Sequence, residues 1–242
     1  MEHIDAKVAH DKIIYWIKDW FKNKKGPVVI GISGGISYGE LGMSHHSAQD
    51  IAAMSAIPNM RVYLPSDRFQ TKKLIEALLK DGKPAYVRVG RNPVEDIYSE
   101  DNVPFEMDKA TVFKYGEGNK KKVVIVACGE MVSEANKAAK ELSEKGMAAT
   151  VLDMYCLKPF DSKTLVRETQ DADLVISIEE HAPFGGLGAN VASVVSTNKP
   201  CQVVQMSLPD DHVIAGKSKE VFNYYKLNAE GIVENAWKKD IL

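Results

Sequence analysis

The residues that decide the fold lie near the start of the chain, where residues 27–57 read PVVIGISGGISYGELGMSHHSAQDIAAMSAI. An apolar run over Pro27–Ser33 predicts a strand, and the spacing over Ser47–Ile57 predicts a helix. Glycines and serines fill the connection, which ends in His45 and His46. Loops at the carboxyl ends of parallel strands form the ligand sites of α/β proteins. Composition alone favours such a site no more than a flexible loop with solvent-facing histidines, because glycine-rich loops are common.

Short β-branched runs and helical patterns alternate after this stretch. Strands are predicted at Arg61–Leu64 and Ala85–Val89, separated by a helix that Ser66 or Asp67 caps and Gly82 ends. This alternation is typical of a parallel sheet covered by helices. Upstream, residues 8–21 carry an apolar stripe at helical spacing with no strand before them. The sheet would be small and poorly covered, so we expect the first domain to be incomplete.

A second series of the same kind begins at Val123. The run Val123–Cys128 is continuously apolar, as expected for a parallel strand that is buried on both faces. Further strands are predicted at Ala149–Met154, Leu174–Ile178 and Gln202–Met206. Helices are predicted at Val132–Lys145, Ser162–Glu168, Gly188–Ser196 and Ala229–Lys239.

The two series are separated by polar sequence. Asn92–Asp108 has the composition of a linker, Ala110–Tyr115 could add an edge strand, and Gly116–Lys122 resembles a turn. We therefore expect an α/β fold with two domains, each a mainly parallel sheet flanked by helices. The predicted boundaries are 1–100 for the first, incomplete domain, 101–122 for the linker and 123–242 for the second domain.

Composition excludes several function classes. The chain has 242 residues, 45% of them apolar and 26% charged, with a formal net charge of −2. No basic tract suits a nucleic-acid backbone, and no apolar run is long enough to span a bilayer. Cys128, Cys156 and Cys201 match neither a disulfide framework nor a zinc site. We expect a soluble, cytoplasmic protein without nucleic-acid or membrane partners.

A family resemblance becomes visible at Gly39-Glu-Leu-Gly-Met-Ser-His45, which resembles the Gly-Glu-Asp-Gly-Pro-Thr-His signature of transketolases. Ile57–Asp67 continues the pattern, and Pro84–Arg91 resembles the strand that ends in the phosphate-binding arginine of the family. Weaker similarity extends through Leu157–Phe160, Glu179–His181 and Gly185–Gly188. The resemblance covers nearly all of the chain from Pro27 onward. It implies the latter part of a pyrimidine-binding domain followed by a transketolase C-terminal domain.

The resemblance also implies roles for individual residues. His45 would be catalytic, through a hydrogen bond to the C1 oxygen of the ketose donor and of the covalent intermediate. Arg91 would bind the substrate phosphate, a task that suits a guanidinium group. Ser33 replaces a phosphate-contacting histidine, so its hydroxyl would bind phosphate more weakly. Leu41 replaces an aspartate that contacts substrate hydroxyls, so the donor would differ from a standard transketolase sugar.

Thiamine diphosphate and Mg²⁺ are the cofactors that the resemblance implies. Most of their binding residues are absent from this sequence, including the Gly-Asp-Gly motif and the upstream glutamate that contacts the pyrimidine ring. We therefore assign no cofactor-binding residue and no metal ligand here. The implied partner is a separate N-terminal transketolase subunit, a second copy of the chain in a homodimer, or both, with a sugar phosphate as substrate.

Three functions remain open at this point. The chain could be the C-terminal subunit of a thiamine-dependent transketolase that transfers a two-carbon ketol unit between sugar phosphates once completed. It could be a truncated, inactive relative that folds and binds a partner. It could also be part of a deoxyxylulose-phosphate synthase or of a 2-oxoacid dehydrogenase β chain. The His45-His46-Ser47 sequence slightly favours this interpretation, whereas Ile57–Asp67 and Arg91 favour a transketolase or the synthase.

Two polar clusters could be mistaken for sites. Glu179–His181 follow a predicted strand and could act as an acid–base group, but the resemblance places them away from the cofactor. Asp210–His212 have metal-binding chemistry without a further ligand nearby. We expect a structural role for the first cluster and solvation for the second.

Overall fold

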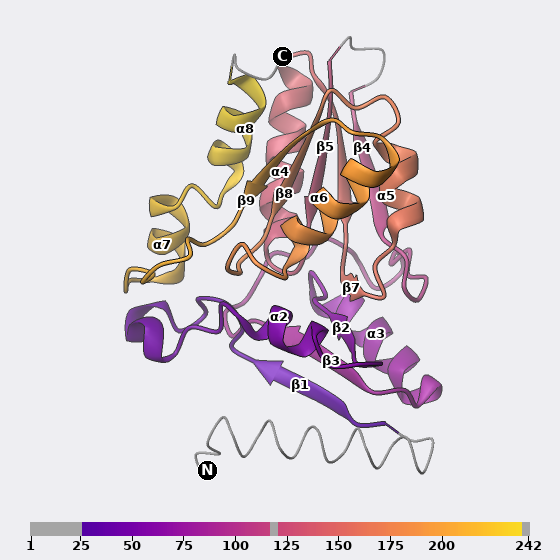
Figure 1. The fold of residues 1–242 in the computed structure, drawn as a ribbon, viewed down its shortest axis with the longest axis vertical. Helices are drawn as coiled ribbons and strands as arrows, with labels where there is room; N and C mark the ends of the chain where they lie inside the picture. The colour runs from indigo at the N-terminus through magenta and orange to yellow at the C-terminus, as the bar shows by residue number, and fades with distance from the viewer. Residues whose placement is uncertain (1–25, 117–120, 239–242) are drawn as a thin grey trace.

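The computed structural model describes residues 26–116 and 121–238, which form two sheets with helices packed against them (Figure 1). The first sheet has the strand order β1-β3-β2-β7. Strands β1 and β2 both run parallel to β3, which lies between them, and β7 joins β2 antiparallel. The elements are β1 (Val28–Ile32), β2 (Arg61–Tyr63), β3 (Ala85–Val89), β7 (Cys156–Lys158), the 3₁₀ segment η1 (Gly39–Ser44), α2 (Asp50–Ser55) and α3 (Arg68–Asp81).

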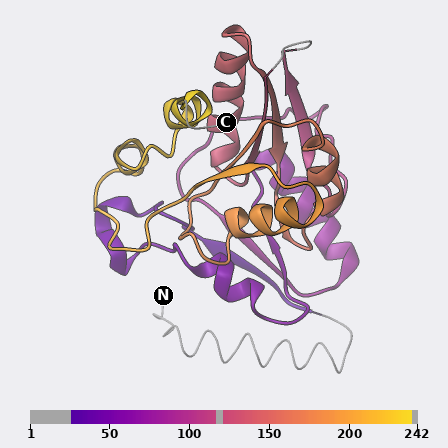
Figure 2. The same ribbon diagram turned by 45° about the horizontal axis from the view of Figure 1, so that its top comes forward.

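The second sheet has the order β4-β6-β5-β8-β9, in which only β4 is antiparallel to its neighbour. Helices α4 and α8 pack together over this sheet, and α5 and α6 pack together elsewhere on it (Figures 1 and 2). The strands are β4 (Thr111–Tyr115), β5 (Lys122–Ala127), β6 (Ala148–Asp153), β8 (Leu174–Ile178) and β9 (Gln202–Met206). The helices are α4 (Met131–Glu144), α5 (Ser162–Glu168), α6 (Leu187–Asn198), α7 (Ser218–Tyr224) and α8 (Ala229–Trp237).

The predicted α/β class with two mainly parallel sheets is confirmed, and the predicted strands and helices agree with the structure to within a few residues at their ends. The predicted helix over residues 8–21 lies outside the described residues. Three elements were not predicted: η1, β7 and α7. All three are short, and short elements owe their conformation to tertiary contacts more than to local periodicity.

The predicted capping of α3 is confirmed in detail. The Asp67 carboxylate accepts a hydrogen bond from the Gln70 N–H at 2.8 Å, which satisfies one of the free donors of the first turn. At the other end Gly82 adopts φ 67°, a left-handed conformation that glycine tolerates. These two residues fix the length of the helix.

The segment expected to be a linker is tied to both sheets. Its Tyr98 is buried, and the Tyr98 hydroxyl donates to the Asp153 carboxylate at 2.7 Å, while the Tyr98 N–H donates to Asp67 at 2.8 Å. The Ser66 hydroxyl also donates to Asp153, at 2.8 Å. Further along, β4 pairs with β6 along its whole length and so belongs to the second sheet. The connection between the domains is therefore packed structure.

The apolar core continues from one domain into the other. One buried cluster joins Val62 of the first sheet to Leu165 of α5 and Val191 of α6, and a second cluster lies between the second sheet and helices α4 and α8. At the far edge of the first sheet, Ile30 and Ile32 of β1 are 51% and 73% exposed. Exposed isoleucines on an edge strand are unusual, because such an edge is a template for further pairing.

Among residues 26–116 and 121–238, no helix combines the length and the apolar character that crossing a membrane requires.

Candidate functional site

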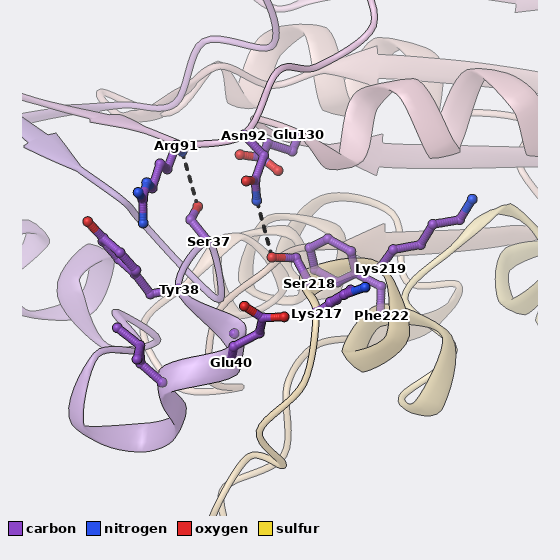
Figure 3. A pocket seen from close by; sticks show the side chains of 12 residues that line it. Ser37, Tyr38, Glu40, Arg91, Asn92, Glu130, Lys217, Ser218, Lys219 and Phe222 are labelled. Atoms are coloured by element: carbon purple, nitrogen blue, oxygen red, sulfur yellow. Dashed lines mark hydrogen bonds between the residues drawn. The ribbon is translucent and has the colours of Figure 1, made fainter.

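A cleft of about 630 Å³ lies where the loop after β1, the end of β3 and the start of α7 meet (Figure 3). Both domains contribute to its walls. The lining residues are Ser37, Tyr38, Gly39, Glu40, Leu41, Arg91, Asn92, Glu130, Lys217, Ser218, Lys219 and Phe222.

Arg91 lines this cleft together with the exposed Lys217 and Lys219. Its guanidinium group lies 4.2 Å from the centre of the Tyr38 ring, a cation–π arrangement that holds the side chain without neutralising it (Figure 3). The Arg91 N–H donates to the Ser37 hydroxyl, which in turn donates to the carbonyl oxygen of Gly34 at 2.7 Å. Within the described part of the chain, no carboxylate forms an ion pair with Arg91. The guanidinium group is therefore available to an anionic ligand.

His45 lies beside the same tyrosine. Its ring centre is 6.0 Å from that of Tyr38, and its Nδ1 atom is 2.9 Å from the Ser44 hydroxyl. The imidazole is exposed and lies next to the cleft without lining it. Gly42 breaks η1 with φ 70°, a left-handed conformation that lets the chain turn before the histidine. Tyr38 therefore lies next to both Arg91 and His45, the residues for which the resemblance implies phosphate binding and catalysis.

Ser33 follows β1 directly and adopts φ 67°, which is uncommon for a residue other than glycine. It does not line the cleft. The next residue, Gly34, donates its N–H to the carbonyl oxygen of Val89 at 3.1 Å and so ties the end of β1 to the end of β3. The structure therefore brings Arg91, Tyr38 and Leu41 around one cleft, places His45 beside it and leaves Ser33 outside its walls.

The second domain supplies a wall that sequence reasoning missed. The Ser218 hydroxyl donates to the carbonyl oxygen of Ile36 at 2.9 Å and accepts from the Asn92 side chain at 3.2 Å (Figure 3). Gly216 donates its N–H to the Gly39 carbonyl oxygen at 3.0 Å. The lysines on either side of Ser218 line the cleft as well. The Lys-Ser-Lys run was the only signal for this wall, and such runs are usually solvated.

The Glu179–His181 segment lies buried where the domains meet. Glu179 accepts the N–H groups of Leu187 and Gly188, both at 2.7 Å, and so caps α6; burial raises the pKa of its carboxyl to about 7. Glu180 accepts the N–H of Ile36, and burial raises the pKa of its carboxyl to about 8 against the opposing effect of Arg88. Neither carboxylate lines the cleft around Arg91.

The polar residues of the part of the chain that the structure describes can also be compared with the requirements of a metal site. Among the described residues, no group of three or more His, Cys, Asp or Glu side chains is arranged to hold a metal ion. His212 and Asp211 are 3.5 Å apart, with exposed side chains. Mg²⁺ on a diphosphate needs only one or two protein carboxylates, so the absence of a larger group among the described residues does not decide where the cofactor would bind. Because the sequence lacks the Gly-Asp-Gly motif of the family, we derive no chemical step through thiamine diphosphate on this chain.

Taken together, the fold and the cleft define a class: an α/β protein in which two domains, each built on a mainly parallel sheet, share one cleft lined by charged side chains. The family model of the transketolase pyrimidine binding domain matches residues 15–95, and that of the transketolase C-terminal domain matches residues 116–232. The chain belongs to the transketolase family.

Individual relatives agree with this assignment. The chain is 41% identical over 208 residues to a subunit of the apulose-4-phosphate transketolase of Phocaeicola vulgatus, covering 86% of this chain and 65% of that relative. It is 32% identical over 209 residues to a 1-deoxy-D-xylulose-5-phosphate synthase of Histophilus somni, covering 86% of this chain and 32% of that relative.

A solved structure agrees as well. A split-gene transketolase, described as an inactive beta4 tetramer, superposes with a TM-score of 0.73 at 34% identity, covering 86% of this chain and 64% of that one. The chain therefore spans less than two thirds of the length of each of these three proteins.

Proposed function

We propose that the chain is the C-terminal part of a split transketolase and presents the substrate-facing side of an active site that another chain completes. The observation that carries this proposal is the cleft in which Arg91 stacks on Tyr38 beside His45. An unneutralised guanidinium group suits the phosphate end of a sugar phosphate, and a neighbouring imidazole suits the hydroxyl groups of a ketose.

The proposed roles follow from these positions. Arg91 binds the phosphate, and His45 hydrogen-bonds the reacting end of the donor. Ser33 does not line the cleft, so the weaker phosphate contact that the resemblance implies for it requires the substrate to extend to the end of β1. Leu41 is 52% exposed at the cleft and has no group that can bond to a sugar hydroxyl. A donor with fewer or differently placed hydroxyl groups there would bind better than the usual ketose phosphates.

In this proposal the cofactors are bound mainly by another chain. Thiamine diphosphate would supply the carbon nucleophile that carries the two-carbon unit, and Mg²⁺ would hold its diphosphate. The Phocaeicola vulgatus relative is itself one subunit of a transketolase, which supports a separate partner, and the solved tetramer supports self-association as well. The exposed isoleucines of β1 support coverage by another polypeptide. We propose that residues 1–100 form the pyrimidine-binding part and residues 123–242 the C-terminal domain, with residues 101–122 as a connection whose strand β4 completes the second sheet. We also propose a cytoplasmic location for the assembly.

The experiment is native mass spectrometry of the chain purified gently from its source, followed by a two-carbon transfer assay on the purified species. We expect a stoichiometric second chain and activity that depends on thiamine diphosphate. A chain that is isolated alone or only with itself, and that stays inactive with supplied thiamine-binding transketolase subunits, would contradict the proposal.

That negative result would favour the second candidate, a folded relative without turnover. The departures at Ser33 and Leu41 are the observations in its favour, because both remove groups that the family uses on its substrate.

Product analysis separates the remaining alternative. A deoxyxylulose-phosphate synthase or an enzyme with a 2-oxoacid dehydrogenase β chain would release carbon dioxide from a 2-oxoacid, whereas a transketolase would not.

A further inference from the structure

The loop that carries His45 is closed at its base. Gly35 and Ser47 exchange both backbone hydrogen bonds, at 3.1 and 2.8 Å. Everything between them, including the cleft-lining residues 37–41, projects from this pair as one loop. We call residues 34–48 the His45 loop. The contacts that hold the Gly35–Ser47 pair at the base of this loop therefore determine where His45 and Tyr38 lie.

Glu180 of the second domain reaches into that base. Its carboxylate accepts the N–H of Ile36 at 2.5 Å, and its carbonyl oxygen accepts from Arg88 Nη2 at 2.8 Å. The same Nη2 atom lies 3.4 Å from the carbonyl oxygen of Ser47, at the other side of the base. Two residues on, the N–H of Ala182 donates to the carbonyl oxygen of Ala48 at 2.8 Å. One short segment of the second domain therefore binds both ends of the His45 loop.

The glycines of the loop are explained by these contacts. A Cβ atom on Gly34 would lie 2.1 Å from Arg88 Nε, and one on Gly35 would lie 2.1 Å from the Glu180 carboxyl carbon. Gly35 also adopts φ 60°, which disfavours other residues. The Gly34-Gly35 pair is thus required by two buried charged side chains of the protein itself, and no ligand needs to be invoked for it.

The charged groups around Glu180 form one buried network. Arg88 Nε lies 3.5 Å from the Asp50 carboxylate, which accepts the Tyr86 hydroxyl at 2.7 Å. Glu130, at the start of α4, faces the same region, and one of its carboxylate oxygens is buried without a hydrogen-bond partner among the described residues. Buried charges of this kind add little net stability compared with apolar packing, but removing one partner is costly because it leaves the others without their interactions.

We propose that Glu180 is a positioning residue that fixes the His45 loop from the second domain, giving that domain a direct part in the organisation of the active site. The structural half of this inference stands on the contacts above, and its catalytic half rests on the proposed function.

Glu179 provides a matched control, because it is the adjacent buried carboxylate and caps α6 without touching the loop. Hydrogen exchange of the full chain is measured by mass spectrometry for wild type, Glu180→Ala and Glu179→Ala. Loss of a buried hydrogen-bond acceptor should speed exchange within residues 34–48 about tenfold or more in Glu180→Ala only. In Glu179→Ala the increase should appear at the start of α6 instead.

Glu180→Gln, which keeps an acceptor for Ile36, should show a smaller increase in the exchange of residues 34–48 than Glu180→Ala. Unchanged exchange of residues 34–48 in Glu180→Ala would overturn the proposal.

Steady-state kinetics of the purified assembly show whether Glu180 positions the active-site residues or only stabilises the fold. Glu180→Ala should lower kcat/KM about tenfold or more, with substantial recovery in Glu180→Gln and near-normal values in Glu179→Ala. If the loop loosens but the Glu180→Ala and Glu179→Ala assemblies have equal kcat/KM, Glu180 does not position the active site. If the wild-type assembly lacks transketolase activity, the proposed function fails, and the exchange pattern alone decides whether Glu180 holds the loop.

Discussion

At the scale of single residues, Tyr38 contacts both Arg91 and His45, the residues to which the proposal assigns substrate binding and catalysis. The Tyr38 ring centre is 4.2 Å from the Arg91 guanidinium group and 6.0 Å from the ring centre of His45. Sequence reasoning identified Arg91 and His45 through a resemblance, but it did not identify the aromatic side chain that connects them. A tyrosine in a glycine-rich loop gives no pattern from which its neighbours can be inferred.

Replacement of Arg91 by alanine should separate phosphate binding from the reaction. We expect the KM for a phosphorylated donor to rise about 10- to 100-fold in the active assembly, because a charge-assisted hydrogen bond to the phosphate is lost. The KM for the unphosphorylated donor should change little. Arg68→Ala is the control, since Arg68 is an exposed arginine paired with Asp96 away from the cleft. Equal effects on both donors would refute the phosphate assignment.

Replacement of His45 by alanine should act on turnover. We expect kcat to fall about 10²- to 10⁴-fold, the usual size of the effect when a proton-transferring or hydrogen-bonding imidazole is removed. His212→Ala is the control, because the His212 side chain is 93% exposed and does not line the cleft. Steady-state kinetics of the assembly test this prediction. A wild-type kcat in the His45→Ala assembly would show that His45 does not take part in turnover.

At the scale of the elements, long apolar runs were predictable and short contacts were not. Val123–Cys128 is apolar throughout and forms most of the central strand β5, because burial on both faces leaves no polar position. By contrast β7 pairs with the first sheet although it comes from the second half of the chain, and α7 lines a cleft formed mainly by the first half. Local periodicity carries no information about either contact, since both are set by how the domains pack.

The Asp67 cap offers a test of how the polar segment after β3 is held. Its carboxylate accepts the Gln70 N–H of α3 and also the N–H groups of Ile97 and Tyr98, at 2.9 and 2.8 Å. We expect Asp67→Ala to lower the free energy of unfolding by about 3 kcal/mol. Asn228→Ala, which removes the cap of α8 and an exposed hydrogen bond to Asn223, should lower the free energy of unfolding by about 1 kcal/mol. Urea denaturation measures both, and equal losses would show that the contacts to residues 97 and 98 contribute nothing.

The buried Glu179 should make stability depend on pH. Burial raises the pKa of its carboxyl to about 7, above the ordinary value of 4.5, so the folded state favours the protonated form. The resulting stability is fully present below pH 4.5 and is lost as the pH rises through about 7. Relative to Glu179→Gln, the free energy of unfolding of the wild-type protein should fall by up to about 3 kcal/mol as the pH rises from 4.5 to about 7. Urea denaturation at several pH values tests this, and a constant difference between the two proteins would contradict the raised pKa.

At the scale of the whole molecule, the two domains form a single structure with a continuous apolar core and a shared cleft. The two sheets and their order in the chain were predictable from the alternation of strands and helices. The meeting of the Glu179–His181 segment with the His45 loop was not, because the bonded residues are more than a hundred positions apart. Among the described residues, Ile30 and Ile32 on the edge strand β1 are exposed, and in the proposed assembly this edge would be covered.

A two-carbon transfer assay on the assembly purified with this chain tests most directly whether the chain is part of a split transketolase. We expect transfer from a phosphorylated ketose donor that requires thiamine diphosphate and the second chain, and that His45→Ala abolishes without dissociating the assembly. Transfer by this chain alone, or full activity of the His45→Ala assembly, would show that the active site is not built in this way.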